Sequence, residues 1–156
     1  MNIYLAGRYS RRLELLGYAE QLTRLGHTIA STWIDGHHET RPNIDTEATA
    51  AEKALWAAED LDDLVRADCA IFFTNEPNGQ GRERGGYHVE FGWVLGWNIA
   101  VGNPIAQKRL IVVGPRVNVF HMLDLLPSPP PPHLEHFDSW SECMAAFLVA
   151  KEELGA

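Results

Sequence analysis

The chain has 156 residues, of which 46% are hydrophobic and 22% are charged. A chain of this length and apolar content can bury a core of its own, so we expect one globular domain over residues 1–156, held together without disulfides or a structural metal. The formal net charge of −8 argues against a nucleic-acid polymer or an anionic membrane as a general partner.

The cysteines and the N-terminal sequence indicate in which cellular compartment the protein is expected. Cys69 falls in a predicted strand and Cys143 in the last predicted helix, so both are expected to be small core residues in a reducing compartment. The chain enters its first strand without the basic and apolar segments of a signal peptide, and no apolar run approaches the roughly 18 residues of a membrane span. We therefore expect a cytoplasmic protein.

Strands and helices alternate along the chain, and this order predicts an α/β fold. We expect a doubly wound, mostly parallel sheet of five strands, flavodoxin-like or Rossmann-like, with right-handed crossovers. In the first helix an apolar stripe is expected to face the core, namely Leu13, Leu16, Ala19, Leu22 and Leu25. The predicted strands are Asn2–Ala6, His27–Trp33, Ala70–Thr74, Gln107–Gly114 and Leu134–Phe137; the predicted helices are Ser10–Leu25, Thr46–Ala67, one opened by Gly85 and Gly86, and Ser139–Leu154.

Glu90 is the strongest candidate for a catalytic residue. A buried strand, a polar loop and a Gly-Gly pair precede it, which places it in the first turn or so of a helix at the carboxyl edge of the sheet. Exposed N–H groups and the helix dipole should favour its ionised form there and lower its pKa. An ionised carboxylate can act as a nucleophile. The alternative is that Glu90 only caps its helix.

The end of the second helix supplies two further candidates. Asp60 and Asp63 lie three residues apart near a helix C-terminus, where the helix dipole disfavours acids. At least one of the two carboxylates should therefore have a local interaction that compensates for this effect, and we expect Asp60 or Asp63 to bind the substrate. A solvated acidic face is the alternative.

The loop after the first strand could hold another part of a ligand. Gly7 permits a tight turn whose N–H groups could hold an anion or a sugar, and Tyr9 could stack on a base or be ordinary surface. Arg8, Arg11 and Arg12 could reach a phosphate or simply be solvated. A GxGxxG pattern is absent and the histidines lack the spacing of zinc ligands, so we expect neither a dinucleotide cofactor nor a metal.

Three segments of the sequence, IYLAG at Ile3–Gly7, DLDDLVRADCAIFF at Asp60–Phe73 and GGYHVEFGWVLG at Gly85–Gly96, carry a family resemblance. They resemble the nucleoside 2-deoxyribosyltransferase superfamily, which includes N-glycosidases of 2′-deoxynucleoside 5′-monophosphates. The resemblance implies that Glu90 is the nucleophile, that Tyr4 hydrogen-bonds it, and that Asp60 is the acid on the sugar or base side. It places Tyr9 beside the base and Gly86 in the substrate-binding turn. It also implies that a partner subunit lends an asparagine to the sugar 5′ end, for which Asn118 is the nearest counterpart.

The substrate that the resemblance implies is a small-molecule nucleoside or nucleotide. Two reactions are then possible, which differ in the acceptor of the deoxyribosyl group. A carboxylate below the sugar ring attacks C1′, and the glycosyl-enzyme ester then passes to another base, as in a transferase, or to water, as in a hydrolase. The loop aspartate that protonates the leaving base in the transferases is replaced here by Gly81-Arg82-Glu83-Arg84; Glu83 or Glu76 could take its place. Arg82 and Arg84 could instead bind a 5′-phosphate, which favours the nucleotide N-glycosidase as the alternative. A non-catalytic nucleotide sensor on the same fold is the second alternative.

The helix that carries Glu90 also suggests self-association. Phe91, Trp93 and Trp97 provide more aromatic surface than a helix of that length easily buries within a small domain. We expect a helix-to-helix homodimer or a higher homo-oligomer, as the family resemblance also implies.

Overall fold

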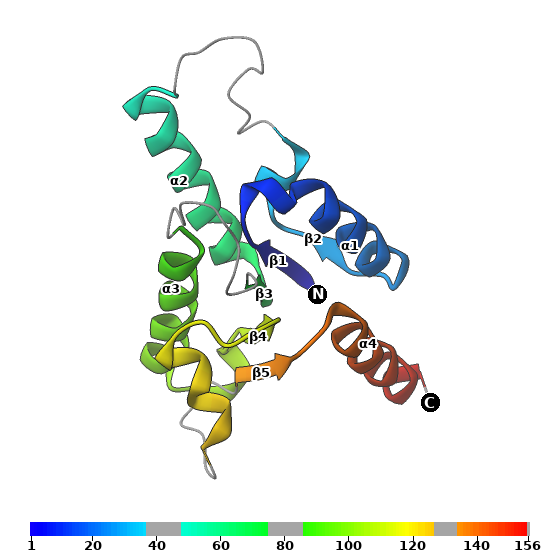
Figure 1. The fold of residues 1–156 in the computed structure, drawn as a ribbon. Helices are drawn as coiled ribbons and strands as arrows, with labels where there is room; N and C mark the ends of the chain where they lie inside the picture. The colour runs from blue at the N-terminus through cyan, green and yellow to red at the C-terminus, as the bar shows by residue number, and fades with distance from the viewer. Residues whose placement is uncertain (37–47, 75–85, 127–133, 156) are drawn as a thin grey trace.

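The computed structural model describes residues 1–36, 48–74, 86–126 and 134–155, and its architecture confirms the predicted α/β fold. Five strands form one parallel sheet in the order β2-β1-β3-β4-β5, with α1 and α4 on one face and α2 and α3 on the other (Figure 1). The strands are β1 (Asn2–Ala6), β2 (Thr28–Ile29), β3 (Cys69–Phe73), β4 (Arg109–Val113) and β5 (Leu134–Phe137). The α-helices are α1 (Arg12–Arg24), α2 (Ala50–Arg66), α3 (Gly86–Val101) and α4 (Trp140–Gly155).

Short 3₁₀ segments complete the described chain, and none of the described helices is long and apolar enough to cross a membrane. The longest of these segments, η4, connects β4 to the part of the chain that leads to β5. The segments are η1 (Tyr9–Arg11), η2 (Thr32–Asp35), η3 (Pro104–Ala106) and η4 (Val119–Leu125).

The central strands are apolar on both faces because helices cover both faces of the sheet. All five residues of β3 are buried. Successive side chains alternate between the two layers: the Phe72 ring packs edge-on against Phe91 of α3, with ring centroids 5.3 Å apart, whereas Phe73 contacts Tyr18 of α1. Tyr4 pairs with Ala70, two residues before Phe72, so its side chain lies on the face covered by α2 and α3.

The second strand is much shorter than predicted, because side chains replace its backbone hydrogen bonds. Only Thr28–Ile29 pair with β1. Beyond them, the Ser31 hydroxyl accepts a hydrogen bond from the Leu5 N–H (2.5 Å), and the Trp33 indole N–H donates to the Leu5 carbonyl (2.9 Å). The chain then turns into η2 instead of extending to Trp33.

The apolar stripe of α1 is partly displaced from its predicted position. The helix begins at Arg12 after the 3₁₀ turn η1, and Leu15 is fully buried while Leu13 is 73% exposed. Residues two apart on a helix point in nearly opposite directions, so Leu13 must face solvent once Leu15 faces the sheet. Cys69 and Cys143 are free and buried as predicted, and burial raises the pKa of both thiols.

Candidate active site

Three polar side chains from different elements converge on the face of the sheet covered by α2 and α3. Tyr4 comes from the centre of β1, Asp60 from α2 and Glu90 from α3. Burial raises the pKa of the Tyr4 hydroxyl well above its usual value, and the charges of Glu90 and then Asp60 raise it further. The charge of Asp63 has a smaller effect in the same direction, so we take Tyr4, Asp60 and Glu90 as the candidate cluster.

Glu90 has a raised pKa, which corrects the expectation of a lowered one. The helix begins at Gly86, so Glu90 lies beyond the first four N–H groups, and the effect of the dipole has already fallen off. Burial is the main cause that raises the pKa of Glu90, to about 7, and the negative charge of Asp60 adds to it. Glu90 is therefore close to half-ionised at neutral pH.

The Tyr4 hydroxyl acts in the opposite direction on Glu90. Its interaction with the carboxylate lowers the pKa of Glu90, because a donor favours the charged form. Yet the hydroxyl is buried and makes no hydrogen bond of standard geometry with a described residue. The two groups thus face each other in a looser contact, of the kind that often tightens only when a substrate is bound.

The surroundings of Glu90 leave its carboxylate available for chemistry. Within residues 1–36, 48–74, 86–126 and 134–155, no ion pair involves Glu90. Gly86, one turn earlier on α3, borders it: a Cβ at this position would lie 3.9 Å from Glu90 Oε1. The structure does not describe four further candidates from the sequence analysis, namely Glu76, Arg82, Glu83 and Arg84.

Asp63 also raises the pKa of Tyr4, but its carboxylate is bound within the fold. Its carboxylate is buried and accepts hydrogen bonds from the Thr32 N–H (2.6 Å) and the Thr32 hydroxyl (2.8 Å), and it forms an ion pair with Arg66. These bonds fasten α2 to η2. The role of substrate ligand stays a prediction for Asp63, whose carboxylate already has these partners within the fold.

The three candidate ligand-binding residues in the loop after β1, Gly7, Arg8 and Tyr9, have different neighbours. A Cβ at Gly7 would lie 2.8 Å from Leu15 Cδ1 and 3.5 Å from Phe73 Cβ, so a side chain there would force Leu15 to shift. Arg8 borders a cavity on the other face of the sheet. Tyr9 is 41% exposed, and its ring centroid lies 6.1 Å from that of Trp33.

Asn118 lies in a histidine cluster that sequence reasoning missed. Its Oδ1 caps η4 by accepting from the Phe120 and His121 N–H groups, and its Nδ2 lies 2.9 Å from His121 Nε2 and 3.3 Å from His88 Nδ1. Burial lowers the pKa of His121 to about 4, so its neutral ring can accept from the amide. His88 lies two residues before Glu90, which connects η4 to the helix that carries Glu90.

The described residues hold no group of three or more His, Cys, Asp or Glu side chains able to bind a metal. The candidate site contains groups suited to acid–base and nucleophilic chemistry, namely the carboxyl groups of Asp60 and Glu90 and the phenol of Tyr4. Paired carboxyl groups of this kind are typical of enzymes that cleave glycosidic bonds.

Comparison with solved structures shows a structural similarity over nearly the whole chain. A solved structure of a 2-deoxyribosyltransferase from the psychrotolerant bacterium Bacillus psychrosaccharolyticus is similar over 94% of this chain and 96% of that chain, with a TM-score of 0.55 and 20% sequence identity. The likeness establishes the fold. No protein-family model and no curated protein matches the sequence.

Proposed function

We propose that this chain cleaves the N-glycosidic bond of 2′-deoxynucleosides through Glu90 and transfers the deoxyribosyl group to another base. The observation that carries the proposal is the cluster of Glu90, Asp60 and Tyr4 on a fold similar to that of a solved 2-deoxyribosyltransferase. The sequence resemblance assigns roles to the same three residues.

In the proposed mechanism, ionised Glu90 attacks C1′ of the sugar. A carboxylate oxygen forms a bond to C1′ while the C1′–N bond breaks, and the base leaves with the electron pair and takes up a proton. The absence of a 2′-hydroxyl eases the oxocarbenium-like transition state. A nitrogen of the acceptor base then attacks C1′ and releases the carboxylate. Tyr4 orients Glu90 and modulates its charge, and Asp60 contacts the sugar or base.

The nucleotide N-glycosidase is retained as the second candidate because Arg82 and Arg84, which shortly precede the helix of Glu90 in the sequence, could bind a 5′-phosphate. In that reaction water replaces the acceptor base, and the products are free base and deoxyribose 5-phosphate. A non-catalytic sensor would more naturally hold Glu90 in a buried salt bridge, and none of the described residues provides one.

The choice among these functions is tested by incubating the protein with deoxynucleosides and deoxynucleoside monophosphates, with and without an acceptor base. Chromatography should detect a new deoxynucleoside only when an acceptor base is present. Release of free base from the monophosphates without exchange would favour the hydrolase. No turnover of any member of the panel would favour the sensor.

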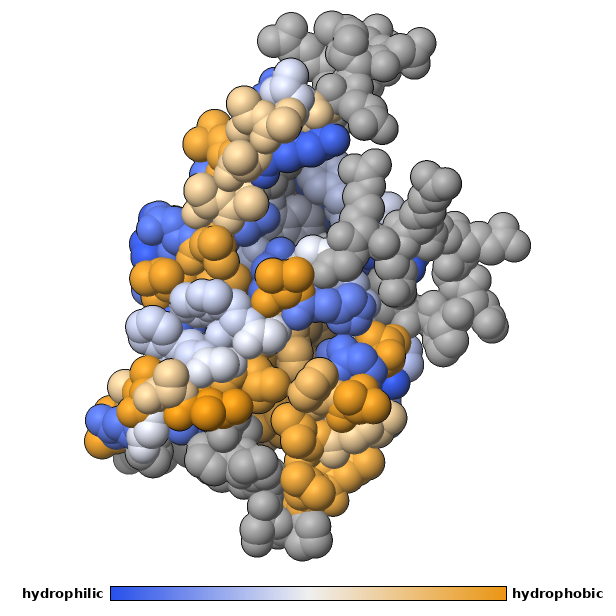
Figure 2. Space-filling view, turned by 90° about the vertical axis from the view of Figure 1, so that its left-hand side faces the viewer, coloured by the Kyte–Doolittle hydropathy of each residue, from blue (hydrophilic) through white to orange (hydrophobic). Residues whose placement is uncertain are grey.

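We further propose that a second copy of the chain covers the apolar surface formed by α3 and η4. This surface is rich in apolar side chains, as the lower part of Figure 2 shows. Phe91 is buried in the core and cannot contribute, which corrects one part of the sequence expectation, but Trp97 is 39% exposed and stacks on Trp93 with ring centroids 5.4 Å apart. The other exposed apolar side chains here are Val89, Ile99, Val119, Phe120, Met122, Leu125 and Leu126.

A dimer through this surface would bring Asn118, which caps η4, close to the partner, in line with the role that the resemblance gives to that residue. Phe120→Asp should convert a dimer to a monomer in sedimentation velocity at micromolar concentration, because it places a charge in the apolar contact. Leu13→Asp places the same charge at an exposed apolar position of α1, on the opposite layer; it is the matched control and should leave the dimer intact. A wild-type protein that sediments as an active monomer would overturn the proposal.

A further inference from the structure

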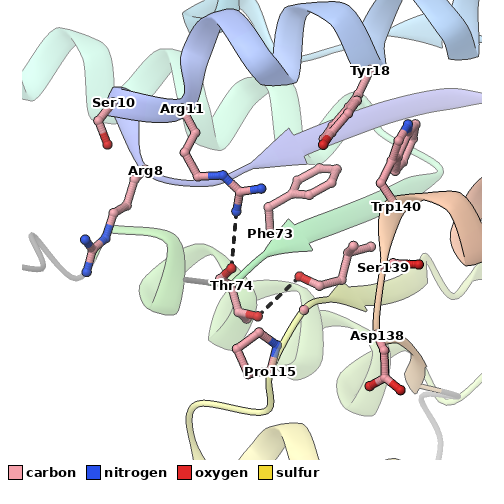
Figure 3. Close-up of a pocket in the computed structure, with 12 residues that line it drawn as sticks. Arg8, Ser10, Arg11, Tyr18, Phe73, Thr74, Pro115, Asp138, Ser139 and Trp140 are labelled. Carbon is pink, nitrogen blue, oxygen red and sulfur yellow. Dashed lines mark hydrogen bonds between the residues drawn. The ribbon is translucent and has the colours of Figure 1, made fainter. Parts of the chain in front are cut away.

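The segment after β4 brings the histidine cluster described above against α3. The chain passes Pro115 at the carboxyl edge of the sheet (Figure 3), and Asn118 then caps the start of η4. This short helix, yellow in Figure 1, lies beside α3, and the ring of His121 packs edge-on against Phe91 of α3 with ring centroids 4.7 Å apart. His121 is fully buried, so the contact between η4 and α3 encloses an imidazole.

The hydrogen bonds of the Asn118 amide fix its orientation. Its oxygen Oδ1 accepts from the N–H groups of Phe120 (2.9 Å) and His121 (3.1 Å), and a backbone N–H can only donate, so the oxygen must lie on that side. The Nδ2 group therefore points to His121 Nε2 (2.9 Å) and His88 Nδ1 (3.3 Å). All four hydrogen-bonding positions of the amide are thus used within the chain.

This orientation also fixes where the two imidazole rings carry their protons. An amide NH₂ group can only donate, so each ring nitrogen that faces it must be unprotonated. The proton of neutral His121 is then on Nδ1, which is buried and has no hydrogen-bond partner among the described residues. A second proton on His121, or one on His88 Nδ1, would place an N–H against the amide N–H groups. The arrangement therefore requires both rings to be neutral.

The charged groups around His121 add to the effect of burial. Burial lowers the pKa of His121 to about 4. Nearby positive charge lowers it further, from His88 on α3, His136 on β5 and Arg116 before η4. Asp124 of η4 acts in the opposite direction, but its carboxylate is paired with Arg116. The closed arrangement therefore excludes a proton that the same ring, once released into water, takes up near its ordinary pKa of 6.5.

We propose that Asn118, His121 and His88 form an acid-sensitive latch, which holds η4 on α3 while both imidazoles are neutral and releases the start of η4 when either ring takes up a proton. The closed latch should lose stability as pH falls from about 6.5 towards 4, because the released state then binds a proton that the closed state excludes. Release would displace the exposed apolar side chains of η4 from those of α3, and so divide the surface at which a second copy is expected to bind. That consequence rests on the dimer proposed above, whereas the latch lies within one chain and can be tested whether or not the dimer or the proposed reaction is confirmed.

The proton positions are tested first, by NMR of the wild-type protein with ¹⁵N-labelled histidine rings. At pH 7 the ring of His121 should be neutral and carry its proton on Nδ1, because Nε2 accepts from the amide of Asn118. A neutral ring with its proton on Nε2, or a ring already protonated at pH 7, would overturn the proposal.

Hydrogen exchange then measures how often the latch opens. The N–H groups of Phe120 and His121 both donate to Asn118 Oδ1, so their protection reports on the start of η4. After correction for the intrinsic exchange rate, this protection should fall roughly 20-fold between pH 7 and pH 5, because the released ring binds a proton over that range. Protection that stays constant over this range would contradict the latch.

Asn118→Asp should abolish this response to acid. A carboxylate keeps the cap by accepting from the same two backbone N–H groups, but its second oxygen accepts from an imidazole N–H and so favours the protonated rings. Protection of the Phe120 and His121 amides should then not fall between pH 7 and pH 5. Asn103→Asp is the matched control, because Asn103 Oδ1 accepts from the Ile105 N–H (3.1 Å) beyond the other end of α3, and it should show the wild-type fall.

A fall in Asn118→Asp equal to that of the wild type would overturn the proposal. If Asn118→Asp does not fold, the proton positions and the exchange profile of the wild type decide the question.

Discussion

Glu90→Gln should reduce deoxynucleoside turnover by at least about 10³-fold while leaving the fold intact. Glutamine keeps the size of the side chain but cannot act as an anionic nucleophile. Steady-state kinetics with the best substrate of the panel measures this change. Glu20→Gln, on the exposed side of α1, is the matched control and should retain activity. Near-normal turnover of Glu90→Gln would end the covalent mechanism.

The same variant should be more stable than the wild type at alkaline pH. Burial raises the pKa of Glu90 to about 7 in the folded protein, so the fold favours the neutral carboxyl. The stabilisation that this preference provides is present below the unfolded pKa of about 4.5 and is lost as pH rises through 7. At pH 8 glutamine removes a half-buried charge, and unfolding by urea should show a gain of about 1–3 kcal/mol; at pH 4 the gain should be small. A loss of stability at pH 8 would indicate that Glu90 is a helix-capping residue.

The second large effect concerns the pH profile of kcat/KM. If Glu90 must be ionised, activity should rise with pH through an apparent pKa of about 7. Asp60→Asn removes the negative charge that raises this pKa, so the acid limb should move to lower pH. Tyr4→Phe removes the donor that lowers it, so the limb should move to higher pH. Both variants should also lose turnover, by roughly ten-fold or more, because each side chain orients the reacting groups.

The acid limb of kcat/KM should shift in opposite directions in Asp60→Asn and Tyr4→Phe, and this difference distinguishes an electrostatic role from a structural one. A purely structural role of Asp60 or Tyr4 would lower activity without moving the limb in a defined direction. Asp62→Asn, two residues from Asp60 but exposed and paired with Arg66, is the matched control and should leave the profile unchanged. Shifts of the same sign in Asp60→Asn and Tyr4→Phe would contradict the arrangement described for the cluster.

The sequence predicted the sheet well where apolar runs were continuous. The runs that became β1 and β3 are apolar apart from Asn2 at the start of β1, because both faces of a doubly wound sheet are covered, and turn residues follow them. Period-two alternation then places Tyr4 on one face. The second strand was overestimated, because no periodicity reveals that Ser31 and Trp33 side chains take the hydrogen bonds of Leu5.

The sequence points to candidate site residues but not to their electrostatics. The position of Glu90 near the start of a helix follows from the preceding glycines, but its raised pKa depends on burial and on Asp60, which belongs to another helix. Likewise, Asp60 and Asp63 look equivalent in the sequence. Only the contact of Asp63 with Thr32, 31 positions away, separates them. Contacts over such separations leave no local signal.

Capture of the glycosyl-enzyme is the most direct test of Glu90 as the nucleophile. Incubation with a 2-fluorinated deoxynucleoside analogue slows breakdown of the ester, and mass spectrometry of a protease digest can then locate the sugar. The mechanism proposed here predicts a sugar adduct on Glu90 in the wild type and none in Glu90→Gln. Release of the base with the adduct on another residue, or an identical adduct in Glu90→Gln, would contradict it.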